Sequence, residues 1–288
     1  MTVMRAIDTA ASGLSAQQVK LEAVADNLAN STTPGFKSAT TVEFQALLSE
    51  TLRPGSKPEG TLGGVNPLQI GTGVEVAGIH RDYSQGAIGI TGASADLAVD
   101  GIGFFILKED SGGRLYTRDG TFSLDAQDRL VDPATGMAVQ GLNADLATFT
   151  VPGVGTLQDL VIPVGDLVVG GATLTGFSVG ADGTITGIFS DSTLRTLGRV
   201  GLARFSNPDG LEHRGGPLFR AGTNSGPALE GAPGTGGFGT LAGGALEASN
   251  VDFVKEFTDL ISAQRAFQAN ARVIARSEEL LEGLVNIV

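Results

Sequence analysis

Two short stretches of the sequence match motifs that carry chemistry in other proteins. Residues 176–180, GFSVG, match the Gly-x-Ser-x-Gly pattern, in which a nucleophilic serine sits on a sharp turn between a strand and a helix. Asp191 and His213 follow Ser178 in the acid-then-histidine order of α/β-hydrolases. The segment after Gly180, ADGTITGIF, is typical of a β-hairpin, so the sequence argues against a serine hydrolase.

The second stretch is GTGGFG at residues 234–239, which matches the Gly-x-Gly-x-x-Gly pattern of phosphate-binding loops. That loop needs a strand before it and a helix after it, whereas Ala232 and Pro233 precede it here, so we interpret it as a glycine-rich loop. His80 and His213 have no second histidine or carboxylate at ligand spacing, which gives a metal site no support. The sequence therefore predicts no catalytic, cofactor-binding or metal-binding residue.

The composition excludes further classes. The chain of 288 residues has a net charge of −12 and no basic run, so it would be repelled by nucleic acid and by anionic membrane surfaces. It has no cysteine, which excludes disulfides, thiolate metal sites and thiol nucleophiles. No segment reaches the roughly 20 apolar residues of a membrane span, and the first residues lack the apolar core of a secretory signal. We expect a folded protein without membrane insertion or a cleaved signal peptide.

Residues 1–30 predict a helix whose seam positions recur at alternating steps of three and four residues, as in a coiled coil. This seam includes Ile7, Leu14, Gln18, Leu21 and Leu28.

Residues 248–288 predict a second helix with the same spacing. Ser249 and Asp252 fit a capping box at its start, and Asn250 is an alternative cap. Its seam includes Phe257, Leu260, Gln264, Phe267, Ile274 and Leu281. A narrow apolar stripe does not stabilise a lone helix in water, so we expect the two helices to pair. The pattern alone leaves open whether this pair is an intramolecular stalk or also packs against other copies.

The middle of the chain divides into two parts. Residues 31–75 are rich in glycine and proline and predict an extended, turn-rich connector. Residues 76–247 alternate in short apolar runs with turns at 119–120, 126–128 and 182–183, which predicts an antiparallel β domain. The predicted fold is therefore α+β, with N- and C-terminal helices paired as a coiled-coil-like inner domain and an antiparallel β domain inserted between them.

Several motifs along the chain resemble the bacterial flagellar rod and hook family. The first helix ends in DNLANSTTPGFKS (26–38), and GALEASNVDFVKEF (244–257) opens the second. NPLQIGTGVEVAGI, DLAVDGIGFFIL and YTRDGTFSLD between them are also of the family type. The matching positions in the two terminal motifs are Asn27, Asn30, Pro34, Gly35, Phe36, Ser249 and Asn250.

This resemblance implies a structural protein and no enzyme. Family members polymerise into a hollow tube with the terminal helices inside, and they leave the cell through the flagellar export channel. The implied partners are further copies of the chain, neighbouring rod and hook–filament junction proteins, a hook cap and the export apparatus with its chaperone. The implied location is the extracellular flagellar basal body and hook.

The motifs most resemble the hook branch of the family, which would make the chain a subunit of the flexible joint that passes torque from rod to filament. The alternative is the distal rod, a rigid drive shaft, because residues 144–175 are a short remnant where larger hook subunits carry an outer domain. Apart from the resemblance, an oligomeric β-rich binding module with a coiled-coil stalk remains open, and an enzyme is the weakest alternative.

Overall fold

The computed structural model describes residues 2–285 except 48, 59–62, 110–111, 146–147, 149, 152–156, 165–167 and 170. The chain divides into two compact units. The helical unit comprises residues 1–29, 39–82 and 251–288, and the β unit comprises 30–38 and 83–250. Chain segments that lie far apart in the sequence therefore build each unit.

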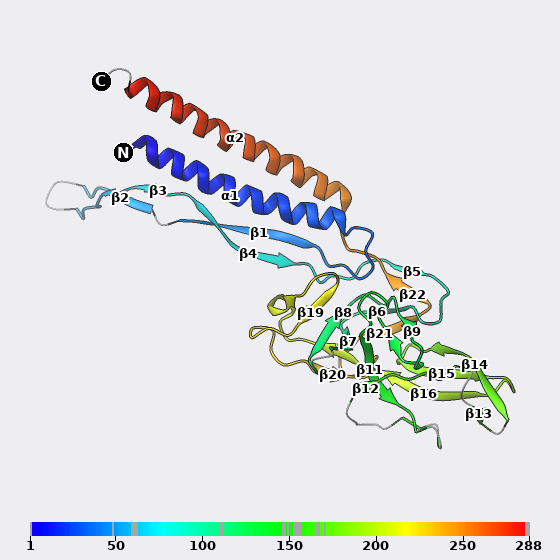
Figure 1. Cartoon of the computed structure of the whole chain (residues 1–288). Helices are drawn as coiled ribbons and strands as arrows, with labels where there is room; N and C mark the ends of the chain where they lie inside the picture. Colours follow the sequence, from blue (N-terminus) through cyan, green and yellow to red (C-terminus); the bar gives the residue numbers. More distant parts are fainter. Residues whose placement is uncertain are drawn as a thin grey trace. The chain divides into compact units, whose positions relative to one another are not determined.

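The helical unit contains two long helices and two antiparallel strand pairs. Helix α1 (Thr2–Ala29) packs against α2 (Phe253–Val285) and, on another side, against β1 (Ala39–Ala46) and β4 (Val74–Arg81). Figure 1 shows α1 between α2 and the β1–β4 ladder. The pairing of N- and C-terminal helices was predicted, and the structure confirms it.

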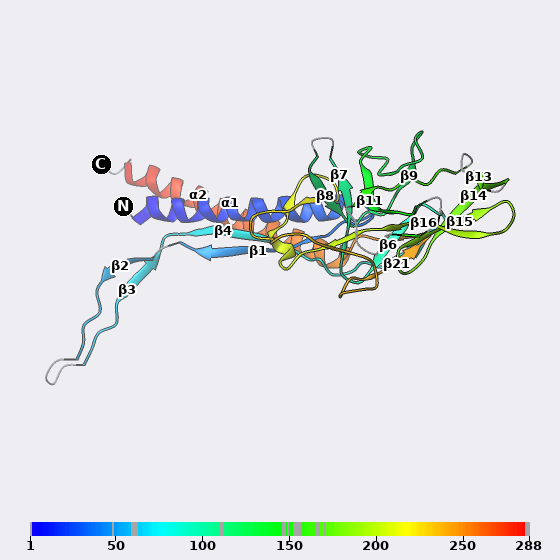
Figure 2. The ribbon, with the colours of Figure 1, turned by 90° about the horizontal axis from the view of Figure 1, so that it is seen from below.

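The connector expected over residues 31–75 contains three strands and the start of a fourth in the structure. Strand β1 pairs with β4 from Ala39↔Arg81 to Ala46↔Val74, and β2 (Ser49–Arg53) pairs with β3 (Leu68–Gly71). Figure 2 shows the β2–β3 pair turning away from the line of α1. The glycines and prolines that suggested an irregular segment concentrate between β2 and β3, while the flanking Thr, Val, Phe and Ile residues favour strand.

The β unit is antiparallel throughout its described strand pairs. Its main sheet follows the order β13-β14-β15-β16-β11-β7-β8-β19-β18, and the pairs β21–β6 and β22–β5 lie outside it. The bounds are β5 (Ile88–Ile90), β6 (Leu97–Asp100), β7 (Phe104–Lys108), β8 (Arg114–Thr117), β9 (Ser123–Leu124), β10 (Leu130–Val131), β11 (Ala138–Asn143), β12 (Gln158–Asp159), β13 (Val168–Val169), β14 (Ala172–Val179), β15 (Thr184–Phe189), β16 (Leu194–Val200), β17 (Leu202–Arg204), a 3-10 turn (Pro208–Gly210), β18 (Glu212–His213), β19 (Leu218–Arg220), β20 (Leu229–Gly231), β21 (Thr240–Gly243) and β22 (Ala245–Glu247).

Two of the three predicted turns are hairpins. The turn at 126–128 joins β9 to β10, and that at 182–183 joins β14 to β15, where Gly183 has φ +76°. The hairpin predicted at 119–120 is wrong, because β8 pairs with β7 and β19 while β9 pairs with β10. Gly120 instead brings its backbone against Leu97, whose N–H donates to the Gly120 carbonyl at 3.0 Å.

The core of the β unit consists of a main cluster and a second cluster that is rich in aromatic residues. Strands β6, β7, β11, β14, β15 and β16 contribute buried Leu, Ile, Val and Phe side chains to the main cluster. A second cluster contains Phe104, Tyr116, Phe205 and Phe219, whose rings meet mostly edge to face with centroids 4.8–6.0 Å apart. Edge-to-face geometry is the favourable arrangement of aromatic quadrupoles.

Gly120→Ala provides a test of this packing. A Cβ at residue 120 would lie 1.5 Å from the Leu97 carbonyl oxygen, so the backbone must move. We expect the free energy of unfolding of the β unit to fall by about 2 kcal/mol or more, measured by urea titration. Gly89→Ala is the matched control, because nothing lies within 4 Å of its Cβ position, and it should change stability by well under 1 kcal/mol. Equal effects of the two substitutions would contradict the predicted clash.

Candidate functional site

Most of the buried side chains on α1 and α2 are small or polar. Ala10, Gly13 and Ala16 are buried on α1, and Ala263 and Ser277 are buried on α2. A Cβ at residue 13 would lie 2.8 Å from the Asn270 Nδ2 atom, so glycine is needed there for the close approach of the helices.

None of the predicted seam residues is fully buried within the subunit. In the described structure Ile7, Leu14, Leu21, Leu28, Leu260, Ile274 and Leu281 are half-buried, whereas Gln18, Phe257, Gln264 and Phe267 are exposed. The close approach of the helices is shown at Gly13, which is not one of the predicted seam residues. Their part in assembly stays a prediction.

Asn27 joins three elements of the helical unit. Its Nδ2 donates to the Ala39 carbonyl at 2.8 Å, and its Oδ1 accepts from the Ala39 N–H at 2.8 Å. Nδ2 also donates to Glu256 Oε1 at 3.0 Å. Asn27 is fully buried and Glu256 is 4% exposed, so the end of α1, the start of β1 and the first turn of α2 share one satisfied polar contact.

The capping predicted at the start of the second helix is wrong. Helix α2 begins at Phe253, and the carboxylate of Asp252 accepts from the N–H groups of Val254 (2.9 Å) and Lys255 (3.2 Å). Asp252 is therefore the N-cap. Asn250 serves the β unit instead, where its Oδ1 accepts from the Ser38 N–H at 2.8 Å and its Nδ2 donates to the Ser84 carbonyl at 3.3 Å.

The family-type segment 30–38 folds as a tight, buried turn in the β unit. The Thr33 N–H donates to the Asn30 carbonyl at 3.1 Å, and half-buried Pro34 follows it. Gly35 has φ +66°, and its Cβ position lies 2.4 Å from backbone atoms of Arg118 and Asp119. Only glycine fits this turn. Phe36, 3% exposed, follows it into the interior.

A buried ion pair holds the end of this segment. Lys37 Nζ lies 2.6 Å from Glu247 Oε1, and the two side chains are 1% and 0% exposed. The ammonium also donates to the Ser84 carbonyl at 2.6 Å, and the Gly86 N–H donates to Glu247 Oε1 at 2.8 Å. The Gly35 N–H donates to the Glu247 backbone carbonyl at 2.8 Å, so side chain and backbone of β22 both hold the segment.

Arg118 adds a second cation to this pair. Its Nη1 lies 3.3 Å from Glu247 Oε2, and its Nη2 donates to the Gly101 carbonyl at 2.6 Å. The guanidinium lies over the Phe104 ring, 5.4 Å from the centroid. Burial lowers the pKa of Arg118 and the Glu247 carboxylate opposes that shift. Two buried cations thus face one carboxylate, and backbone carbonyls solvate the excess positive charge.

The enzyme motifs have other surroundings. Ser178 lies exposed on β14, opposite Thr186 in the β14–β15 hairpin, and GTGGFG is the loop between β20 and β21. His80 Nε2 lies 3.5 Å from Glu43, and His213 Nε2 contacts the Gly216 carbonyl at 2.6 Å. Within the described ranges, no three His, Cys, Asp or Glu residues gather as a metal site, and no helix is long and apolar enough to span a membrane.

The sequence analysis missed Lys37, Arg118, Glu247 and Glu256. A signal existed for Glu247, because strand alternation places it on the same face as buried Ala245. Glu247, the carboxylate that Lys37 and Arg118 share, lies more than 100 residues from either of them, and no local pattern indicates this contact.

Lys37→Met should destabilise the β unit by about 3–5 kcal/mol, because it leaves a buried carboxylate without its closest cation. Lys108→Met is the matched control: Lys108 Nζ lies 3.3 Å from Asp159, but that lysine is 52% exposed, and its loss should cost under about 1 kcal/mol. Urea titration monitored by tyrosine fluorescence measures both. A Lys37→Met chain as stable as Lys108→Met would contradict the role of the buried pair.

Burial raises the pKa of Glu256 above its ordinary value near 4.5. Between the ordinary pKa and the raised pKa, the folded chain holds more protons than the unfolded chain. This carboxyl therefore lowers the free energy of unfolding as the pH rises through that range. Glu256→Gln keeps an acceptor for Asn27, and its stability advantage over the unchanged chain should grow from pH 4 to pH 7. Urea midpoints of the helical signal measure it. Glu282→Gln, an exposed change on the same helix, is the control and should show no such growth.

Three family models match the chain, one in each part of the sequence. They are "Flagella basal body rod protein" at residues 7–37, "Flagellar hook protein FlgE/F/G D1 domain" at 98–187 and "Flagellar basal body rod FlgEFG protein C-terminal" at 242–287. The first covers most of α1 and the buried turn as far as Lys37, and the last covers Glu247 and α2.

Full-length relatives agree with these models. The chain is 37% identical over 287 residues to the flagellar basal-body rod protein FlgG of Bacillus subtilis, covering 99% of both chains. It is 36% identical to FlgG of Caulobacter vibrioides over 97% of both chains. It is 27% identical to the flagellar hook protein FlgE of Borreliella burgdorferi over 442 aligned positions, covering 99% of this chain and all of that protein. With its paired terminal helices and inserted antiparallel β unit, the chain belongs to the flagellar basal-body rod and hook protein family, whose members are structural components of the flagellar axis.

Proposed function

We propose that the chain is a subunit of the distal rod, which polymerises into a tubular drive shaft in the flagellar basal body. The observation that supports this is length. The relatives named FlgG align with the chain end to end, with 99% of both the chain and the Bacillus subtilis protein covered. The chain therefore matches this rod protein in length as well as in sequence.

The hook, which the motifs favoured first, is the less supported assignment. The hook protein of Borreliella burgdorferi needs 442 aligned positions to match these 288 residues. It therefore carries additional sequence that this chain lacks. In the β unit, only residues 144–171 separate β11 from β14, and several of them lie outside the described residues. The remnant predicted at 144–175 is too short for an outer domain.

The exposed apolar side chains of the helical unit favour assembly with further copies. On α2, Val254 is 77% exposed, Phe257 53% and Ile261 50%. These side chains lie within two turns of the helix and form one apolar patch. A monomer seldom exposes such a patch, because burying it in a partner is favourable. In a polymer of identical subunits, the nearest partner is the next copy.

The remaining assignments follow from this proposal. The partners are further copies of the chain and the neighbouring proteins of the rod and hook, and the location is the flagellar basal body. Transport to that location would use the flagellar export apparatus. The chain acts through assembly and force transmission, without catalysis.

Electron microscopy of a strain lacking this chain tests the proposal. We expect basal bodies truncated within the rod, with no hook above them, and recovery on re-expression of the chain. Complete rods without hooks would overturn the distal-rod assignment in favour of the hook. Normal flagella in the deletion strain would contradict a place in the flagellar axis altogether.

A further inference from the structure

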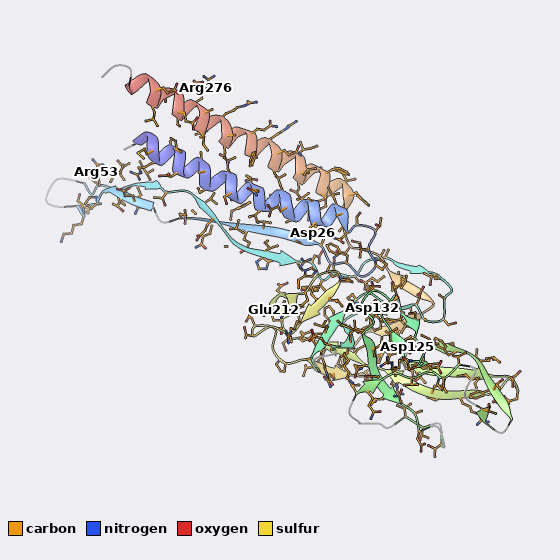
Figure 3. All side chains as sticks on the ribbon, in the orientation of Figure 1. Asp26, Arg53, Asp125, Asp132, Glu212 and Arg276 are labelled. Carbon is orange, nitrogen blue, oxygen red and sulfur yellow. The ribbon has the colours of Figure 1, made fainter. Side chains whose placement is uncertain are left out.

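The face of α2 turned away from α1 is basic. Arg265 and Arg272 are exposed and seven residues apart, so they lie on one side of the helix. Among the described residues neither has an ion-pair partner. Arg276 continues the row and pairs with Glu279 at 2.6 Å. Figure 3 shows Arg276 on the side of α2 away from α1, which marks the direction of this row.

An exposed face of α1 is acidic. Asp8 and Glu22 are exposed and fourteen residues apart, with exposed Ser15 between them at the heptad step. Asp26 is exposed one turn beyond Glu22. The two cations of α1 lie elsewhere on the helix: Arg5 pairs with Glu50 at 2.7 Å, and Lys20 pairs with Asp259 of α2 at 3.2 Å. This face therefore carries charge of one sign.

We propose that the acidic face of α1 (Asp8, Glu22, Asp26) in one copy packs against the basic face of α2 (Arg265, Arg272) in a second copy. This inference rests on the proposed function and names the contact that orients the subunits. Contacts between two α1 faces or two α2 faces would bring like charges together. The charges therefore select an α1–α2 contact between copies over the two symmetric alternatives.

The selected contact has a consequence for the form of the polymer. It uses different surfaces on the two copies, so it is heterologous, and heterologous contacts that do not close into a ring build open helical filaments. The energy of association comes from apolar burial at Val254, Phe257 and Ile261 nearby on α2. Exposed ion pairs add little energy each, and their role here is direction and register.

Charge reversal distinguishes this contact from non-specific apolar association. One variant carries Arg265→Glu and Arg272→Glu, so that both faces are acidic. The other carries Asp8→Lys and Glu22→Lys, so that both faces are basic. Each variant alone should show a critical concentration for polymerisation raised by roughly tenfold or more, measured by sedimentation, because every contact now opposes like charges. Circular dichroism confirms that each folds as the unchanged chain does.

An equimolar mixture of the two variants is the decisive sample. The basic α1 face of one variant meets the acidic α2 face of the other, and the acidic α1 face of the latter meets the basic α2 face of the former. Filaments containing both chains should therefore return. Arg53→Glu with Arg214→Glu changes exposed residues elsewhere, lowers the net charge as much as the Arg265→Glu, Arg272→Glu variant does, and should polymerise normally.

Three results would overturn the proposed contact: folded variants that polymerise alone like the unchanged chain, a mixture that does not recover, or a control that fails as the variants do. These outcomes leave the distal-rod proposal intact provided that the unchanged chain forms filaments. An unchanged chain that forms no filament under any condition would overturn the proposed function and the contact with it.

Discussion

The β unit is closed by one buried electrostatic group. Lys37, Arg118 and Glu247 come from three distant parts of the sequence, and their side chains are at most 5% exposed. A buried carboxylate without its cations would be strongly unfavourable, so the segments that carry these residues can leave their places only at a high cost in free energy. The tight turn at Gly35 and the strand pair β22–β5 depend on this group, because both lie against Glu247 or its neighbours.

The helical unit follows a different constraint, which is the close approach of two backbones. Gly13 leaves room for Asn270, and most of the other buried apolar residues on the two helices are small. Since small side chains bury little apolar area, the pair gains less from its own interface than a leucine-rich coiled coil does. The larger side chains stay at the surface of the subunit, where further copies can cover them. The same distribution of small residues inside and larger apolar residues outside accounts for both the weak internal packing and the apolar outer faces.

The fold could be predicted from local patterns where local forces decide it. Heptad spacing gave both helices, and the turns at 126–128 and 182–183 followed from short polar links between apolar runs. The hairpin predicted at 119–120 does not form. Gly120 is required there by close packing against Leu97, and the sequence alone does not distinguish such a glycine from one in a hairpin turn. The strands β1, β2 and β3 were not predicted, because the glycines and prolines between β2 and β3 dominated the composition of residues 31–75. The buried group of Lys37, Arg118 and Glu247 could not be predicted, because its members are distant in the sequence and come together only in the folded chain.

The separation of Lys37 and Glu247 also fixes an order of events. The two residues stand 210 positions apart, so a chain that emerges from its N-terminus carries the lysine uncompensated until almost all of its length has appeared. Closing so long a loop is entropically unfavourable and slow compared with forming a hairpin. The β unit therefore cannot reach its final state piece by piece. In a chain that passed through a narrow channel, the β unit would stay incompletely folded until the last fifth of the sequence, which contains Glu247, had emerged.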